Sequence, residues 1–161
     1  MSASPYQLLV FDWNGTLSTG LIDLDHPIVS PLFPGVVDML KQLSQIYHLA
    51  VATFASRHQL TMELEHYGIA DCFSALACGD DGMRKPEALV LTQLADQLGI
   101  ELAKTLMIGD TETDLLCAEN AGVDSVTVNV HNADWLDNQS PKACLDSITD
   151  LPGWLASDAS R

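Results

Sequence analysis

Polar residues that can bind a metal ion and a phosphoryl group follow four apolar segments of the chain. Asp12 follows the run LLVF, Thr53 follows LAVA, and Asp110 and Asp114 lie in GDTETD after TLMI. Lys85 lies on a loop after the third apolar run. A group of carboxylates with one ammonium suits Mg²⁺ and a phosphoryl group, and Asp12 could attack phosphorus as a covalent nucleophile. These residue types indicate phosphoryl chemistry assisted by a divalent cation.

The overall charge limits the partners that the chain can bind. Its 161 residues include 7 Lys and Arg and 22 Asp and Glu, which gives a formal net charge of −15. Such a surface repels phosphate backbones and anionic lipid headgroups, so we expect neither nucleic-acid nor membrane-surface binding. A bound phosphate therefore needs a local positive centre, such as a metal ion held by some of the acids.

Two further features bear on the cellular location. No apolar run approaches the roughly 20 residues that a membrane span needs, and the N-terminus lacks the basic start of a secretory signal. The four cysteines are separate in the sequence and form no CxxC pair, which indicates free thiols in a reducing setting. We therefore predict a cytoplasmic protein.

Short apolar runs alternate with stretches of helical periodicity. The runs predict buried strands at residues 8–11, 49–52, 73–78, 105–108 and 126–130, and the periodic stretches predict helices around 36–46, 60–67, 91–98 and 115–121, the third opened near its first turn by Pro86. This alternation is typical of an α/β fold with a doubly wound parallel sheet flanked by helices. We expect one domain over residues 1–156, a surface loop at 18–34 and a frayed tail at 157–161.

The predicted sheet gathers the chemical groups at one edge. Ligands of such folds bind at the carboxyl ends of the strands, near the point where the strand order reverses. Asp12 and Asp110 directly follow predicted strands, and the spacing of four places Asp114 on the same helix face as Asp110. We expect these three acids to form a metal site.

The same residues carry a resemblance to a known family. The segment FDWNGTL, then Thr53, then Lys85-Pro86, then GDTETD resembles the four motifs of the haloacid dehalogenase superfamily. The segments AENAGV and DSITDLPGWL are similar to its phosphoglycolate-phosphatase-like branch. The match runs in order through nearly the whole chain. It implies a Rossmann-like fold and a Mg²⁺-dependent phosphatase that acts on phosphate monoesters of small molecules or macromolecules.

The resemblance also implies a role for each matching residue. Asp12 corresponds to the nucleophile that becomes a transient aspartyl-phosphate. Thr53 corresponds to the hydroxyl that binds a phosphoryl oxygen, and Lys85 to the cation that holds nucleophile and phosphate together. The implied ligands of Mg²⁺ are the side chains of Asp12, Asp110 and Asp114 and the backbone carbonyl of Asn14.

Asn14 departs from the family pattern. Phosphatases of this family usually have a second aspartate there, which protonates the leaving oxygen and then activates water. An amide cannot exchange a proton in this way, so the expected loss is about 10²–10⁴-fold in rate. Asp23 or Asp25 in the following loop could replace the missing acid, or an acidic leaving group could depart without one. The alternative function is a catalytically impaired protein with a binding or regulatory role.

A second departure is the absence of room for a cap domain. Relatives in this branch usually insert a helical cap between the first motif and the next helix, whereas residues 18–34 are too few for a helical lid. We therefore expect a capless, open site that takes bulky phosphoesters or is covered by a second copy in a homo-oligomer. Trp13 could form an apolar wall for the substrate, or it could instead pack against residues 18–34.

Overall fold

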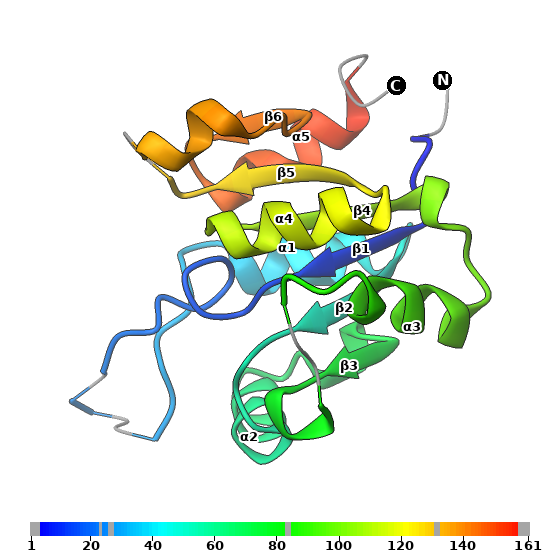
Figure 1. Cartoon of the computed structure of the whole chain (residues 1–161). Coiled ribbons are helices and arrows are strands. Elements are labelled where there is room, and N and C mark those ends of the chain that lie inside the picture. Colours follow the sequence, from blue (N-terminus) through cyan, green and yellow to red (C-terminus); the bar gives the residue numbers. More distant parts are fainter. Residues whose placement is uncertain (1–3, 23, 26–27, 83–84, 131–132, 158–161) are drawn as a thin grey trace.

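A six-stranded parallel sheet forms the centre of the protein. The computed structural model describes residues 4–22, 24–25, 28–82, 85–130 and 133–157. The strands lie in the order β3-β2-β1-β4-β5-β6 (Figure 1). Their bounds are β1 Leu8–Phe11, β2 His48–Ala52, β3 Ala75–Ala77, β4 Thr105–Gly109, β5 Asp124–Val128 and β6 Ala143–Leu145. The predicted doubly wound α/β fold is confirmed.

Helices cover both faces of the sheet, and alternate residues of each central strand face them. Leu9 and Phe11 of β1 belong to one hydrophobic cluster, while Leu8 and Val10 belong to the other. The first cluster is covered by α1 (Val36–Leu43), α2 (Arg57–His66) and α5 (Leu151–Ala156). The second is covered by α3 (Leu89–Leu98) and α4 (Glu112–Ala121). Burial on both faces explains why β1 is a continuous apolar run.

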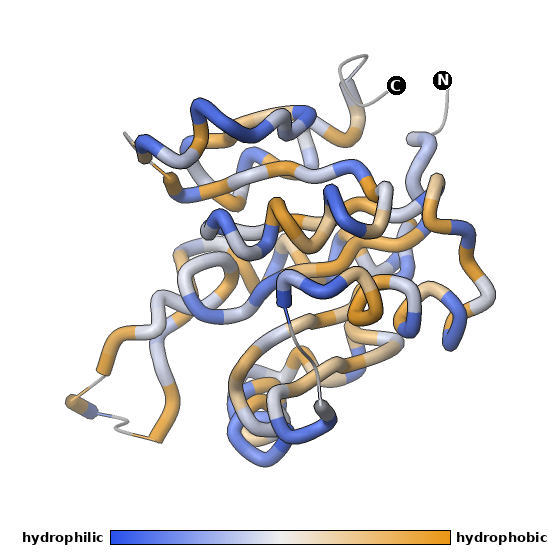
Figure 2. The backbone as a smooth tube through the Cα atoms, viewed as in Figure 1, coloured by the Kyte–Doolittle hydropathy of each residue, from blue (hydrophilic) through white to orange (hydrophobic). Residues whose placement is uncertain are grey.

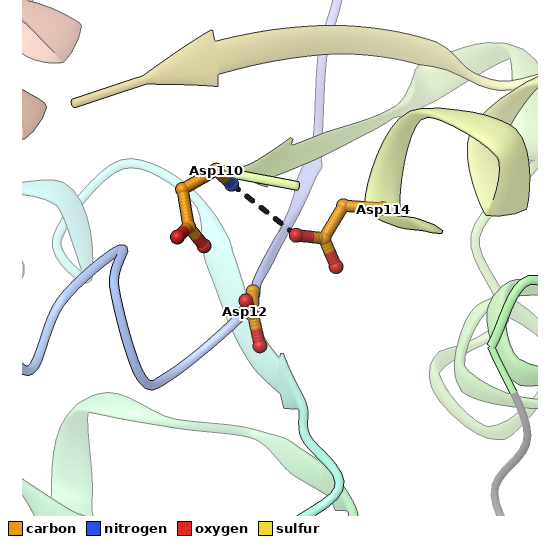
Figure 3. A group of neighbouring side chains, drawn as sticks. All are labelled: Asp12, Asp110 and Asp114. Carbon is orange, nitrogen blue, oxygen red and sulfur yellow. Dashed lines mark hydrogen bonds between the residues drawn. The ribbon is translucent and has the colours of Figure 1, made fainter. Parts of the chain in front are cut away.

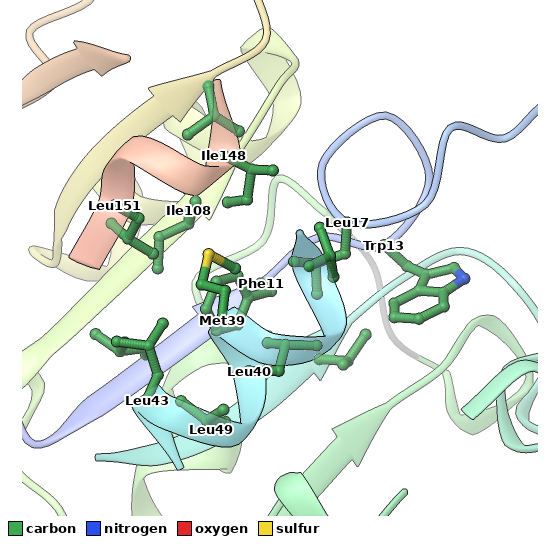
Figure 4. Close-up of a cluster of buried hydrophobic side chains, with 14 of the residues drawn as sticks. Phe11, Trp13, Leu17, Met39, Leu40, Leu43, Leu49, Ile108, Ile148 and Leu151 are labelled. Atoms are coloured by element: carbon green, nitrogen blue, oxygen red, sulfur yellow. The ribbon is translucent and has the colours of Figure 1, made fainter. Parts of the chain in front are cut away.

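The central strands consist mostly of hydrophobic residues, and side chains of the first cluster pack against α1 (Figures 2 and 4). Short 3-10 helices connect the longer elements. They span Ala70–Cys72, Gly79–Asp81, Leu102–Lys104, Asp134–Asn138 and Ile148–Asp150. In the described residues, no helix is long and apolar enough to cross a bilayer.

Two elements were not predicted, and a third begins later than predicted. The strand β6 was not predicted, because it is an edge strand that is only partly buried and its apolar run, ACL, is only three residues long. The helix α5 was not predicted as an element. The helix α3 begins at Leu89 rather than near Pro86, because residues 85–88 form turns.

The segment between β1 and α1 projects from the body of the protein (Figure 1). Between β1 and α1 the described residues contain turns and two isolated bridges, Asn14 with Ser18 and Ser18 with Leu32, and no helix. Residues 158–161 of the predicted frayed tail lie outside the described residues, and α5 ends just before them at Ala156.

Candidate active site

The centre of the sheet is the point where the strand order reverses. The strands β1 and β4 are neighbours, but α1 covers one face of the sheet and α4 covers the other. Asp12 directly follows β1, and its backbone N–H donates to the Ile108 carbonyl of β4 at 3.0 Å. Asp110 directly follows β4. The fold therefore places both acids at the edge where ligands of doubly wound sheets bind.

Three carboxylates converge at this edge. One oxygen each of Asp12, Asp110 and Asp114 lie within 4.8 Å of one another (Figure 3). Asp114 is fully buried, Asp12 is 8% exposed and Asp110 is half-buried. Three negative groups this close, away from solvent, repel one another unless protons or cations lie between them.

Lys85 supplies one such cation. Its Nζ donates to Asp12 Oδ1 at 2.9 Å and to Asp114 Oδ1 at 2.7 Å, and its side chain is 2% exposed. Burial alone would lower the pKa of Lys85, but the two carboxylates raise it above the ordinary value. Lys85 therefore stays charged and links the loop after β1 to the start of α4.

The surroundings of Asp12 change the pKa of its carboxyl group. Burial raises its pKa well above the usual range, and Asp114 and Asp110 act in the same direction while Lys85 opposes them. With no metal ion bound, a proton on Asp12 relieves the repulsion among the three acids. A divalent cation would displace that proton and restore the carboxylate.

Asp114 already uses both of its oxygens within the protein. Oδ1 accepts from Lys85, and Oδ2 accepts from the backbone N–H groups of Asp110 and Thr111, each at 3.2 Å, and from the Thr111 hydroxyl at 2.9 Å. Thr111 and Asp114 form a reciprocal capping box at the start of α4. A side chain at Gly109 would overlap Asp114. These contacts make Asp114 an anchor for Lys85 and for the helix.

The turn after Asp12 is held from two sides. Gly15 has φ +86°, and a Cβ there would overlap the Asp110 carboxylate, so this close approach requires glycine. The Thr16 hydroxyl donates to Asp110 Oδ1 at 2.9 Å. The Asn129 side chain donates to the carbonyls of Gly15 and Thr16 at 2.9 and 3.1 Å. The turn after Asp12 is thus held to the residues that follow β4 and β5.

A pocket of about 240 Å³ opens beside Asp12. Thr53 is buried there, and its Oγ1 accepts from the Ala55 N–H at 3.2 Å. Asn14 is exposed at the wall of the pocket. The lining residues are Asp12, Asn14, Thr53, Phe54, Ala55, Lys85, Thr111 and Thr113. The structure therefore brings the four predicted catalytic residues to one cavity.

Trp13 does not face this pocket. Its side chain is fully buried in the first hydrophobic cluster, and its indole N–H donates to the buried carboxylate of Glu63 on α2. Glu63 also accepts from Gln59 at 2.9 Å and, more weakly, from the Ser30 N–H at 3.4 Å. The prediction that Trp13 forms a substrate wall is wrong, because the indole is buried and bonded between the nucleophile turn and α2. The alternative, packing toward residues 18–34, describes it better.

The two acids considered as replacements for the missing aspartate lie in the projecting segment. Asp25 is exposed there, and Asp23 lies outside the described residues. Asp25 does not line the described pocket.

Three residues of the site were not singled out from the sequence. Asn129 was included in a predicted strand, although β5 ends one residue before it and its φ of +59° is typical of a turn. Glu63 was one more acid on a predicted helix. Phe54 follows Thr53, and an apolar residue directly after a strand end is a signal that could have been used.

The donor set fits Mg²⁺. All of the converging side chains offer oxygen, which this ion prefers. Lys85 pairs with Asp12 and Asp114, and no Lys or Arg among the described residues pairs with Asp110. The turn after Asp12 is closed through the carbonyls of Trp13 and Ser18, so the Asn14 carbonyl is not used in closing it. Asp12, Asp110 and that carbonyl are the donors least committed to protein contacts.

The sequence matches known proteins over most of its length. The family described as haloacid dehalogenase-like hydrolase matches residues 23–128. A phosphoglycolate phosphatase from Agrobacterium fabrum is 34% identical over 65% of this chain and 46% of its own length. One from Vibrio vulnificus is 32% identical over 76% of this chain and 56% of its own length. The chain thus spans about half the length of these curated relatives.

Solved structures show the same fold. A predicted phosphoglycolate phosphatase from Haemophilus somnus has a TM-score of 0.81 at 18% identity and covers 94% of this chain and 99% of its own. A 2-haloacid dehalogenase from Pseudomonas syringae has a TM-score of 0.73 at 16% identity, with 94% and 98% covered. At these identities the comparison concerns the fold alone.

Proposed function

The chain belongs to the haloacid dehalogenase-like hydrolases, and from this premise we propose that it is a Mg²⁺-dependent phosphatase of phosphate monoesters. The observation that carries the proposal is the convergence of Asp12, Asp110 and Asp114 with Lys85 at one edge of the sheet. The phosphoglycolate phosphatases among the relatives support a phosphorylated substrate.

Asp12 is the proposed nucleophile. Its carboxylate oxygen attacks phosphorus, the bond from phosphorus to the ester oxygen breaks, and an aspartyl-phosphate forms. Water then attacks the same phosphorus, the bond to Asp12 breaks, and inorganic phosphate leaves. Lys85 keeps Asp12 oriented through its 2.9 Å contact, and Thr53 is placed in the same pocket to donate to a phosphoryl oxygen.

We assign direct binding of Mg²⁺ to Asp12, Asp110 and the Asn14 carbonyl. When bound, the ion supplies positive charge that offsets the negative charge of the transferring group. Asp114 instead holds Lys85 and the start of α4, because both of its oxygens already accept hydrogen bonds from the protein. Asp114 was predicted as a ligand, and in this proposal it is a positioning residue.

Asn14 makes the proposed reaction slow. It lies at the pocket where a leaving oxygen would depart, but its amide cannot donate a proton and later accept one from water. The proton for the leaving group then comes from solvent, and the rate falls by about 10²–10⁴-fold. The same observation favours the second candidate function, a protein that binds Mg²⁺ and a phosphorylated partner with little turnover.

Hydrolysis of an activated aryl phosphate with and without Mg²⁺ tests the proposal. We expect slow Mg²⁺-dependent turnover by the wild type, no turnover by Asp12→Asn, and about 10²–10⁴-fold faster turnover by Asn14→Asp. Asp38→Asn, which changes an exposed acid on α1, is the matched control and should behave as wild type. Intact mass must confirm that Asn14 before Gly15 has not deamidated, since deamidation would create aspartate there.

The same measurement separates the two candidate functions. Turnover in Asn14→Asp that Asp12→Asn abolishes supports a phosphatase site with one altered residue. Absence of turnover in every variant, together with retained Mg²⁺ binding, would refute the phosphatase and support the binding role.

A further inference from the structure

An exposed aromatic ring stands at the mouth of the pocket. Phe54 is 61% exposed, and in the described part of the chain it is the only Phe, Trp or Tyr that is exposed to this degree. It directly follows Thr53 and lines the same cavity as Asp12 and Lys85. A large apolar side chain left in water beside a polar site is a candidate contact for a ligand.

Two contacts fix the backbone and the ring of Phe54. The Gly79 N–H donates to the Ala55 carbonyl at 2.9 Å, and a Cβ at Gly79 would overlap the Phe54 carbonyl, so the two backbone segments pack closely. Lys85 Nζ lies 5.5 Å from the centre of the Phe54 ring, within the range of a cation–π contact. A fixed backbone and this contact position the ring before any ligand binds, which reduces the entropy cost of binding.

The volume of the pocket determines which part of a ligand can contact the Phe54 ring. A cavity of about 240 Å³ is smaller than the roughly 300–1,000 Å³ that encloses a drug-sized ligand. It can take a phosphoryl group and the first atoms of the leaving group. The rest of the leaving group would then lie outside, at the level of the exposed ring.

The charges of the pocket argue against a second anionic group on the ligand. Among the described lining residues Lys85 is the only cation, and it is already shared between Asp12 and Asp114. A carboxylate on the leaving group would find no positive partner there, in a chain whose net charge is −15. An uncharged leaving group avoids this repulsion.

We propose that Phe54 forms a binding subsite for the leaving group and selects phosphate monoesters with a planar, uncharged ring near the ester oxygen. The inference rests on the proposed phosphate site. Stacking of an aromatic pair supplies a preference of about 2- to 12-fold over a small aliphatic group.

Binding of phosphonates, which cannot be hydrolysed, tests the subsite without turnover. We would measure dissociation constants in Mg²⁺ by calorimetry for phenylphosphonate, methylphosphonate and phosphonoacetate. The wild type should bind phenylphosphonate about 2- to 12-fold more tightly than methylphosphonate, and phosphonoacetate least tightly. In Phe54→Ala the ratio of phenyl to methyl should fall to near one, and in Phe54→Tyr it should persist.

Ile46→Ala is the matched control, because Ile46 is also an exposed apolar residue, at 68%, but does not line this pocket. A ratio that is already near one in the wild type, or that survives in Phe54→Ala, would overturn the subsite. If the wild type prefers phenylphosphonate and Phe54→Ala does not, but no variant shows turnover, the subsite is supported and the phosphatase proposal fails. Absence of binding for all three phosphonates would overturn both.

Discussion

Replacing Lys85 with methionine tests the electrostatic design of the site most directly. The Lys85 side chain is 2% exposed and its Nζ lies 2.9 Å from Asp12 and 2.7 Å from Asp114. Methionine has a similar length and no charge, so it leaves two carboxylates in the interior without their cation. Breaking a buried ion pair in this way costs about 3–5 kcal/mol of the free energy of unfolding.

The measurement is urea unfolding at pH 8 in the presence of a chelator. With a slope of about 1–3 kcal/mol per molar urea, the expected loss lowers the unfolding midpoint by roughly 1–5 M. Lys104→Met is the matched control, because Lys104 is 45% exposed and lies 3.9 Å from Glu101. An exposed pair of this kind contributes about 0.2–1 kcal/mol.

Two further measurements distinguish the loss of the ion pairs from a packing defect as the cause of the lower stability of Lys85→Met. Adding Asp12→Asn to Lys85→Met removes one of the uncompensated charges, so the two changes together should cost less than their sum, by about 0.5–3 kcal/mol. The loss should also shrink at pH 5. Burial raises the pKa of Asp12, and without Lys85 the opposing effect is gone, so the stabilising protonation of Asp12 is lost as pH rises.

Two outcomes would refute this account of the site. One is a loss for Lys85→Met no larger than that for Lys104→Met. The other is a loss that neither pH nor Asp12→Asn changes, because a simple packing defect would behave in that way.

Two further predictions concern Trp13 and the metal site. Trp13→Phe leaves the buried Glu63 without its indole donor and should lower the free energy of unfolding in urea by about 1–3 kcal/mol. The control is Trp135→Phe, which changes a partly exposed indole. An equal loss in both variants would argue against the hydrogen bond between Trp13 and Glu63. Because burial raises the pKa of Asp12, Mg²⁺ must displace a proton, so its affinity should rise from pH 6 to pH 8.5 and calorimetry in two buffers should detect proton release. An affinity that does not change with pH, or that Asp110→Asn leaves intact, would contradict the assigned site.

The sheet could be predicted because its central strands are buried on both faces. The run LLVF predicted β1 with its observed bounds, since every side chain in it packs against a helix layer. The edge strand β6 has no such constraint. Its three residues are only partly buried, and its pairing with β5 is a long-range contact that local sequence does not encode.

The positions of the acids followed from the strands, but their contacts did not. The spacing in GDTETD predicted that Asp114 and Asp110 share a helix face. The two carboxylates do lie close together, but Asp110 precedes α4, which begins at Glu112, so the shared helix face was wrong. The spacing did not show that Thr111 and Asp114 cap α4, although Thr at the cap with an acid three residues later is a known signal. The environment of Trp13 depends on Glu63, 50 residues later in the chain. That contact required the packing of α2 and could not be derived from either segment.

The difference between the two candidate functions reduces to one exposed side chain. Lys85, Asp114 and the capped start of α4 position Asp12 without any contribution from the Asn14 side chain, which lies at the surface of the pocket. Under the proposed function, the affinity for Mg²⁺ and phosphate would depend on buried charges, whereas turnover would depend on a proton donor at an exposed position. Because these requirements fall on different residues, a substitution at Asn14 can change the rate while the binding site is retained. Under that function, a change at Asn14 alone would remove or restore catalysis without a change in the fold of the site.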